Sequence, residues 1–108
     1  MSTATQQHCT PCEKGAKPLQ GEVLEQLIDQ LGEGWAVVEG KKLQKQYQFD
    51  DFKQAWSFVD LVAELAEEEN HHPNIEFTWG KATITLWTHK IDGLHENDFI
   101  MAAKIDEL

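Results

Sequence analysis

Hydrophobic residues recur every three or four positions in three stretches of this chain, as they do on one face of an α-helix. These stretches are residues 22–31, 52–70 and 96–108. Gly32 and Gly34 are expected to stop the first helix, and Asp50 or Asp51 can cap the start of the second. The pattern therefore predicts three helices, of which the second is about five turns long.

The segments between these helices have the composition of β-strands, and most of them alternate apolar with polar positions. Four strands are predicted, over residues 35–38, 43–49, 75–79 and 82–88. Short links that contain Gly40 and Gly80 join them into two hairpins. The predicted order is α-β-β-α-β-β-α, and its simplest arrangement is an α+β domain with one antiparallel sheet covered by helices on one face.

At 108 residues, the chain has the length of one domain with a single core. Residues 1–18 are mostly polar and are expected to form a flexible tail before a folded domain over residues 19–108. Nineteen acidic and nine basic residues give a net charge of −10. This charge argues against nucleic acid or an anionic membrane as the main partner.

The two cysteines, Cys9 and Cys12, lie in the polar tail with CxxC spacing. A thioredoxin-type redox site needs a strand before the motif and a helix after it, and this tail predicts neither. Together with His8 they offer three metal ligands, whereas a structural zinc site usually has four. No role is therefore expected for the pair. The absence of a disulfide framework and of an export signal indicates a cytoplasmic protein.

Titratable side chains are densest between Glu67 and Pro73, where His71 and His72 follow three glutamates. Pro73 favours an extended conformation for His72, so the second helix is expected to end at or just before His71. If the last turn holds, Glu67 lies four residues before His71 and can orient its ring. Paired imidazoles beside a carboxylate suit proton transfer, but a solvated pair of loop histidines would have the same sequence.

His89 follows the last predicted strand and is expected on the sheet face opposite Ile84 and Leu86. Together with the two adjacent histidines and Glu67, it would supply enough ligands for zinc. Neighbouring side chains diverge in extended backbone, so two adjacent histidines seldom bind one ion. No metal is therefore expected at this site.

The spacing Glu67-x3-His71-His72-Pro73, followed by Trp79, His89 and Asp98, resembles the signature of pterin-4a-carbinolamine dehydratases. The resemblance covers about residues 19–108. It extends to four further segments: Gly34-Trp35, Phe49-Asp50-Asp51-Phe52, Thr83-Ile84-Thr85-Leu86 and Gly93-Leu94.

This resemblance implies a four-stranded antiparallel sheet with three helices on one face, in a subunit that forms homodimers or homotetramers. It implies a hydro-lyase that converts 4a-hydroxytetrahydropterin to quinonoid dihydropterin and water. That reaction recycles the pterin used in aromatic amino acid hydroxylation, so the substrate is a small pterin and a hydroxylase is one conceivable partner. No metal or organic cofactor is implied.

By position, the resemblance assigns catalysis to His71, His72 and His89. We expect His71 and His89 to be the acid–base pair and His72 to orient the pterin. Support and substrate binding are assigned to Glu67, Trp35, Pro73, Trp79 and Asp98. The chain departs from the family pattern at three positions: Trp79, where many members have Tyr; Trp87, where some have a small residue; and His95, where Ser or Thr is commoner as a helix cap.

Two other functions remain open at this point. The same fold can act as a non-enzymatic dimerisation or interaction module, and pterin chemistry can be linked to molybdopterin. The three intact histidines favour the enzyme, because a pure binding module has no need of all of them.

Overall fold

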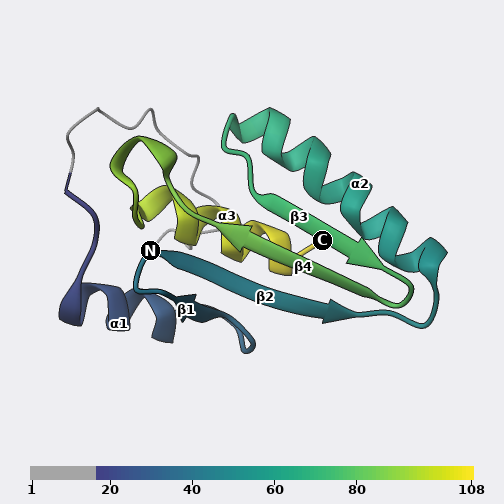
Figure 1. Ribbon diagram of the computed structural model, residues 1–108, viewed down its shortest axis with the longest axis horizontal. Helices are drawn as coiled ribbons and strands as arrows, with labels where there is room; N and C mark the ends of the chain where they lie inside the picture. Colours follow the sequence, from purple (N-terminus) through teal and green to yellow (C-terminus); the bar gives the residue numbers. More distant parts are fainter. Residues whose placement is uncertain (1–16) are drawn as a thin grey trace.

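The computed structural model describes residues 17–108 and contains the predicted order of elements (Figure 1). The helices are α1 (Gly21–Asp29), α2 (Phe52–Glu69) and α3 (Glu96–Asp106), with a short 3₁₀ helix η2 (His89–Ile91). The strands are β1 (Ala36–Val38), β2 (Lys42–Gln48), β3 (Asn74–Thr78) and β4 (Lys81–Leu86). His8, Cys9 and Cys12 lie outside the described residues.

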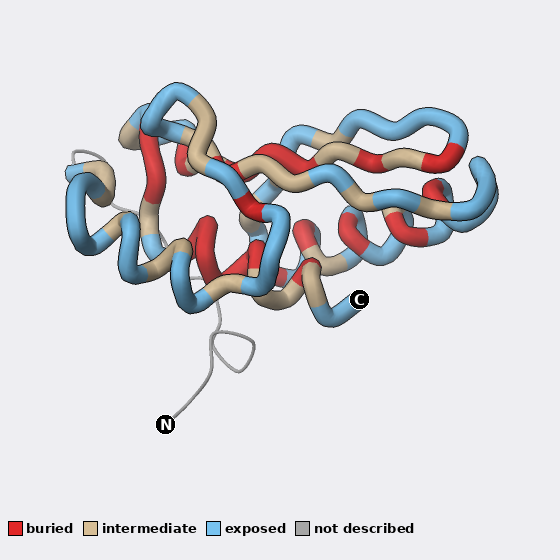
Figure 2. Tube along the Cα trace, turned by 90° about the horizontal axis from the view of Figure 1, so that it is seen from below, coloured by how far each residue is buried: buried red, intermediate tan, exposed pale blue. Residues whose placement is uncertain are grey.

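All four strands pair antiparallel in one sheet, in the order β1-β2-β4-β3, so β1 and β3 are its edges. Figure 2 shows the sheet with the helices packed beneath it, on one face. The predicted α+β fold with three helices on one face is therefore confirmed. None of the helices in residues 17–108 is both long and apolar enough to cross a membrane.

The alternation along the strands decides which side chains meet the helices. Leu43 of β2 lies opposite Leu86 of β4, and both are fully buried, as is Ile84. The glutamines that alternate with Leu43 lie on the other face, where Gln44 Nε2 donates to Thr85 Oγ1 at 3.1 Å. Burying each large aliphatic side chain contributes about 1.5–3 kcal/mol, so this alternation holds the helices to one face.

Local capping fixes the ends of α2. Asp51 precedes the helix in an extended conformation and its side chain accepts from the backbone N–H of Gln54 at 2.8 Å. Asn70 adopts a left-handed conformation with φ of 51°, which ends the helix one residue earlier than predicted.

The structure corrects the end of the last strand. β4 stops at Leu86, because the chain turns and Thr88 pairs with Gly93, whose carbonyl accepts from the Thr88 N–H at 2.8 Å. His89 consequently begins the 3₁₀ helix and does not continue the strand. Trp79, predicted as the last residue of β3, lies in the turn between β3 and β4.

Candidate functional site

A buried carboxylate near the start of α3 gathers groups from three parts of the chain. Asp98 has no exposed surface. Its Oδ1 contacts His71 Nε2 at 2.6 Å, and its Oδ2 accepts from Thr88 Oγ1 and from the backbone N–H of His95, both at 2.9 Å. The last bond belongs to the cap of α3, in which His95 Nδ1 accepts from the Asn97 N–H at 3.1 Å.

The chemistry of this cluster follows from its donors and acceptors. An ionised carboxylate can only accept hydrogen bonds, so an ionised Asp98 requires the proton between it and His71 to be on Nε2. The Nδ1 of His71 is then the ring nitrogen that can take up or release a proton. The His71 side chain is 13% exposed, so most of the ring is held by protein while an edge stays accessible.

The end of α2 directs His71 toward α3. After the left-handed Asn70, the N–H of His71 donates to the carbonyl of Ala66 at 3.1 Å, as in a Schellman cap. Because the helix ends before residue 71, Glu67 and His71 do not share a helical face. The predicted Glu67–His71 pair is therefore wrong, and Asp98 takes that place.

Glu67 instead pairs with His72, whose Nε2 lies 2.6 Å from Glu67 Oε2. Both side chains are largely exposed, at 55% for His72 and 80% for Glu67. Exposed ion pairs contribute little to stability, so this pair orients an accessible imidazole without fixing the fold. Pro73 follows directly and leads into β3.

His89 is exposed and stacks on Trp87, with ring centroids 4.3 Å apart and an interplanar angle of 13°. Between these two residues, Thr88 is buried and bonded to Asp98. The segment that follows β4 thus links His89 to the carboxylate that holds His71. Sequence reasoning missed Thr88, although strand alternation places it on the same side as the buried Leu86.

The structure places Trp35 and Trp79 away from these histidines within one chain. Trp35 is buried, and its Nε1–H donates to Asp106 Oδ2 at 2.9 Å. Asp106 lies eight residues after Asp98 on α3, about 12 Å along the helix axis. Trp79 is 69% exposed in the turn that follows β3, whereas His72 precedes that strand.

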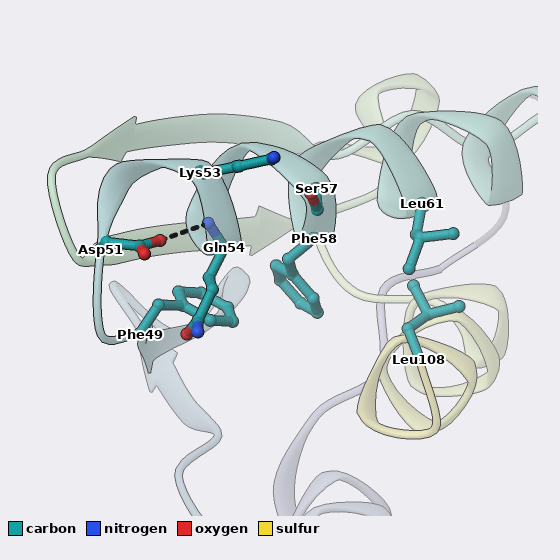
Figure 3. A pocket seen from close by; sticks show the side chains of 8 residues that line it. All are labelled: Phe49, Asp51, Lys53, Gln54, Ser57, Phe58, Leu61 and Leu108. Atoms are coloured by element: carbon teal, nitrogen blue, oxygen red, sulfur yellow. Dashed lines mark hydrogen bonds between the residues drawn. The ribbon is translucent and has the colours of Figure 1, made fainter.

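A separate open groove lies beside the first half of α2 (Figure 3). Phe49, Phe58, Leu61 and Leu108 supply its apolar lining, and it contains no histidine. The histidine cluster lies beyond the other end of α2, so this groove is distinct from the candidate site. Among residues 17–108, no group of three or more His, Cys, Asp or Glu side chains has the geometry to hold a metal ion.

The chain is similar to proteins from several bacteria. A protein of Rubrobacter xylanophilus, provisionally named a pterin-4-alpha-carbinolamine dehydratase, is 53% identical over 108 residues, the full length of both chains. A Vibrio cholerae protein with the same provisional name is 50% identical over 103 residues, covering 93% of this chain and 94% of its own.

Two solved structures share the fold. One is a transcriptional coactivator/pterin dehydratase from Brucella melitensis, with a TM-score of 0.78 and 29% identity over 84% of this chain and 97% of that one. The other is a pterin dehydratase-like protein identified as a RuBisCO assembly factor in the alpha-carboxysome, with a TM-score of 0.60 and 30% identity over 69% and 88%.

The family model described as pterin 4 alpha carbinolamine dehydratase matches residues 17–108, which include every histidine of the candidate site. The chain therefore belongs to the pterin 4 alpha carbinolamine dehydratase family.

Proposed function

We propose that this protein dehydrates 4a-hydroxytetrahydropterin to quinonoid dihydropterin and water by histidine acid–base catalysis. The observation that carries the proposal is the bond between His71 Nε2 and the buried Asp98, which leaves the other nitrogen of that ring for proton transfer. Recycling of tetrahydropterin in the cytoplasm, alongside an aromatic amino acid hydroxylase, is the physiological setting that we propose.

The reaction needs two proton movements. The C4a–O bond breaks as a proton reaches the leaving hydroxyl, and the proton on N5 departs as the C4a–N5 double bond forms. Imidazoles do both near neutral pH, because their ordinary pKa lies close to it. We assign the two transfers to His71 and His89, and the binding and orientation of the pterin to the exposed His72.

The test is dehydration of freshly generated 4a-hydroxytetrahydropterin, followed against its spontaneous rate. Wild-type protein is expected to accelerate the reaction. His71→Ala and His89→Ala are each expected to lower kcat by about 100-fold or more, the range of general acid–base catalysis. Circular dichroism confirms that each variant is folded.

His8→Ala is the matched control, since the family resemblance gives that histidine no role, and it is expected to keep wild-type activity. Full activity in both the His71→Ala and His89→Ala variants would refute histidine catalysis.

A non-enzymatic interaction module is the second candidate. Two observations favour it: one structural relative is named a coactivator and another an assembly factor, and this chain exposes large apolar side chains. Folded wild-type protein that leaves the spontaneous dehydration rate unchanged would support this candidate over the enzyme.

We also propose that a second copy of this chain covers the β3 edge. Phe77 of β3 stacks on Phe52 of α2 with ring centroids 5.3 Å apart, and both are exposed, as is the neighbouring Trp56. An edge strand flanked by exposed aromatic rings favours pairing with another chain. Phe77→Glu is expected to weaken self-association in sedimentation experiments.

Val23→Glu is the matched control for Phe77→Glu, because Val23 is also an exposed apolar residue but lies on α1, outside this patch. A wild-type protein that sediments as a monomer would refute the assembly.

A further inference from the structure

The residues that directly follow β4 carry a stack of side chains on the face of the sheet that the helices leave open. Leu86 is buried against the helices, so the next residue, Trp87, points to the opposite face. His89 lies almost parallel to the Trp87 indole, at 4.3 Å between centroids and 13° between planes. Lys42 of β2 places its Nζ 4.6 Å from the centroid of the same ring.

This arrangement gives His89 a kind of support that differs from that of His71. His71 is held by a hydrogen bond to a buried carboxylate, whereas His89 is exposed and begins a 3₁₀ helix. The terminal torsion of a histidine side chain is broad, so an exposed imidazole without such a contact turns freely. A flat indole at van der Waals distance restricts the ring to one plane.

We propose that Trp87 is the positioning residue for His89, whose imidazole plane it fixes by stacking. The proposal rests on the proposed function for its catalytic consequence. A ring held in one plane presents its nitrogens in a fixed direction. The rotational freedom of the ring is then already lost before the substrate reacts, which lowers the entropic cost of the reaction. Lys42 contributes by holding the indole through a cation–π contact.

Two substitutions at one position test the stack. Trp87→Phe keeps a flat ring, and Trp87→Leu keeps an apolar side chain without one. In nuclear magnetic resonance spectra, the ring protons of His89, assigned with His89→Ala, are expected upfield in the wild type because of the indole ring current. The upfield shift is expected to persist in part in Trp87→Phe and to vanish in Trp87→Leu.

The kinetic readout separates positioning from binding. Trp87→Leu is expected to lower kcat by about two- to tenfold, the span of an aromatic pair interaction, while KM changes by less than about twofold. Trp87→Phe is expected to recover most of the lost kcat. Thermal melting checks that both variants fold. If Trp87→Leu does not fold, Trp87→Phe alone is compared with the wild type.

The outcomes are distinct. No upfield shift in the wild type, or a wild-type kcat in Trp87→Leu despite loss of the shift, overturns the proposal. If the wild-type protein has no dehydratase activity, the proposed function fails by itself. The ring-current shift and its loss in Trp87→Leu then still decide whether Trp87 fixes the plane of His89.

Lys42→Met and Lys41→Met form a second matched pair. Lys41 lies next in sequence, but its Nζ donates to Asp92 at 2.8 Å on the surface. Lys42→Met is expected to reduce the upfield shift of His89 slightly and Lys41→Met to leave it unchanged. If the upfield shift of His89 is the same in Lys42→Met as in Lys41→Met, Lys42 does not hold the indole.

Discussion

Helix α3 carries two aspartates that each gather three hydrogen-bond donors, and their partners differ in kind. Near its start, Asp98 contacts an imidazole, a threonine hydroxyl and a backbone N–H. At its end, Asp106 accepts from Trp35 Nε1 at 2.9 Å, Lys45 Nζ at 2.8 Å and Tyr47 OH at 2.6 Å.

The two carboxylates therefore serve different purposes. None of the side-chain types that donate to Asp106 has an ordinary pKa near 7, so they are not suited to proton transfer at neutral pH. They fasten β2 and the residue before β1 to α3. Asp98 contacts a histidine, the side-chain type whose ordinary pKa allows proton exchange near pH 7. The comparison shows that the donor, more than the carboxylate, decides whether such a cluster can take part in proton transfer.

Of the changes that test this comparison, Asp98→Asn is expected to have the largest effect, because it keeps the shape of the side chain and removes its charge. An amide can donate to His71 Nε2 and so favour the wrong tautomer, and we expect kcat to fall by about 100-fold. Steady-state dehydration kinetics measure this effect. Activity within threefold of the wild type would show that His71 works without the charge of Asp98.

Asp106→Asn is the same substitution at the other end of the helix. We expect it to lower the free energy of unfolding by about 1–3 kcal/mol, because three donors lose a charged acceptor, while kcat stays near that of the wild type. Urea denaturation and the same kinetic assay measure the two quantities. A loss of kcat as large as that of Asp98→Asn would break the comparison between the two clusters.

Tyr47 makes the Asp106 cluster sensitive to alkaline pH. Burial, with the bond to Asp106, raises the pKa of its phenol well above the ordinary value of 10.0. The folded state thus keeps a proton that the unfolded chain loses above pH 10, so the stabilisation is complete below pH 10 and declines as the pH rises further.

Tyr47 is the single tyrosine of the chain, so absorbance of tyrosinate follows it without interference. Tyrosinate is expected to form together with unfolding, and the stability of Tyr47→Phe is expected to depend less on pH above 10. Ionisation at the ordinary pH in the folded protein would contradict the raised pKa.

The smallest effect is expected at the exposed carboxylate of Glu67. Glu67→Gln leaves His72 with a neutral partner on the surface, and exposed pairs contribute less than about 1 kcal/mol. We expect kcat and KM to change by less than about threefold, in contrast with Asp98→Asn. A hundredfold loss would give Glu67 the role that we assign to Asp98.

The fold was predictable because its signals are local. Alternation in β2 predicted the face that carries Leu43, and helical spacing predicted α2 to within one residue. The end of β4 was not predictable in this way. Thr88 leaves the strand because it pairs with Gly93, and only the turn between them brings the two together.

The candidate site was likewise predictable only in its local features. The family signature contained the three histidines and Asp98, but spacing suggested that Glu67 would orient His71. That inference assumed a continuous last turn, which the left-handed Asn70 ends. His71 instead contacts Asp98, which lies 27 residues later in the sequence.

By itself, the sequence determined the order of the elements, the buried face of the sheet, the family and the chemical types available for catalysis. Periodicity and residue type act between near neighbours, so a linear chain displays them. Only the tertiary structure decided which carboxylate each histidine contacts, that Trp35 belongs to the Asp106 cluster, and that Trp87 stacks on His89. Those partners depend on how α3 and the sheet pack, and packing is a property of contacts between distant residues.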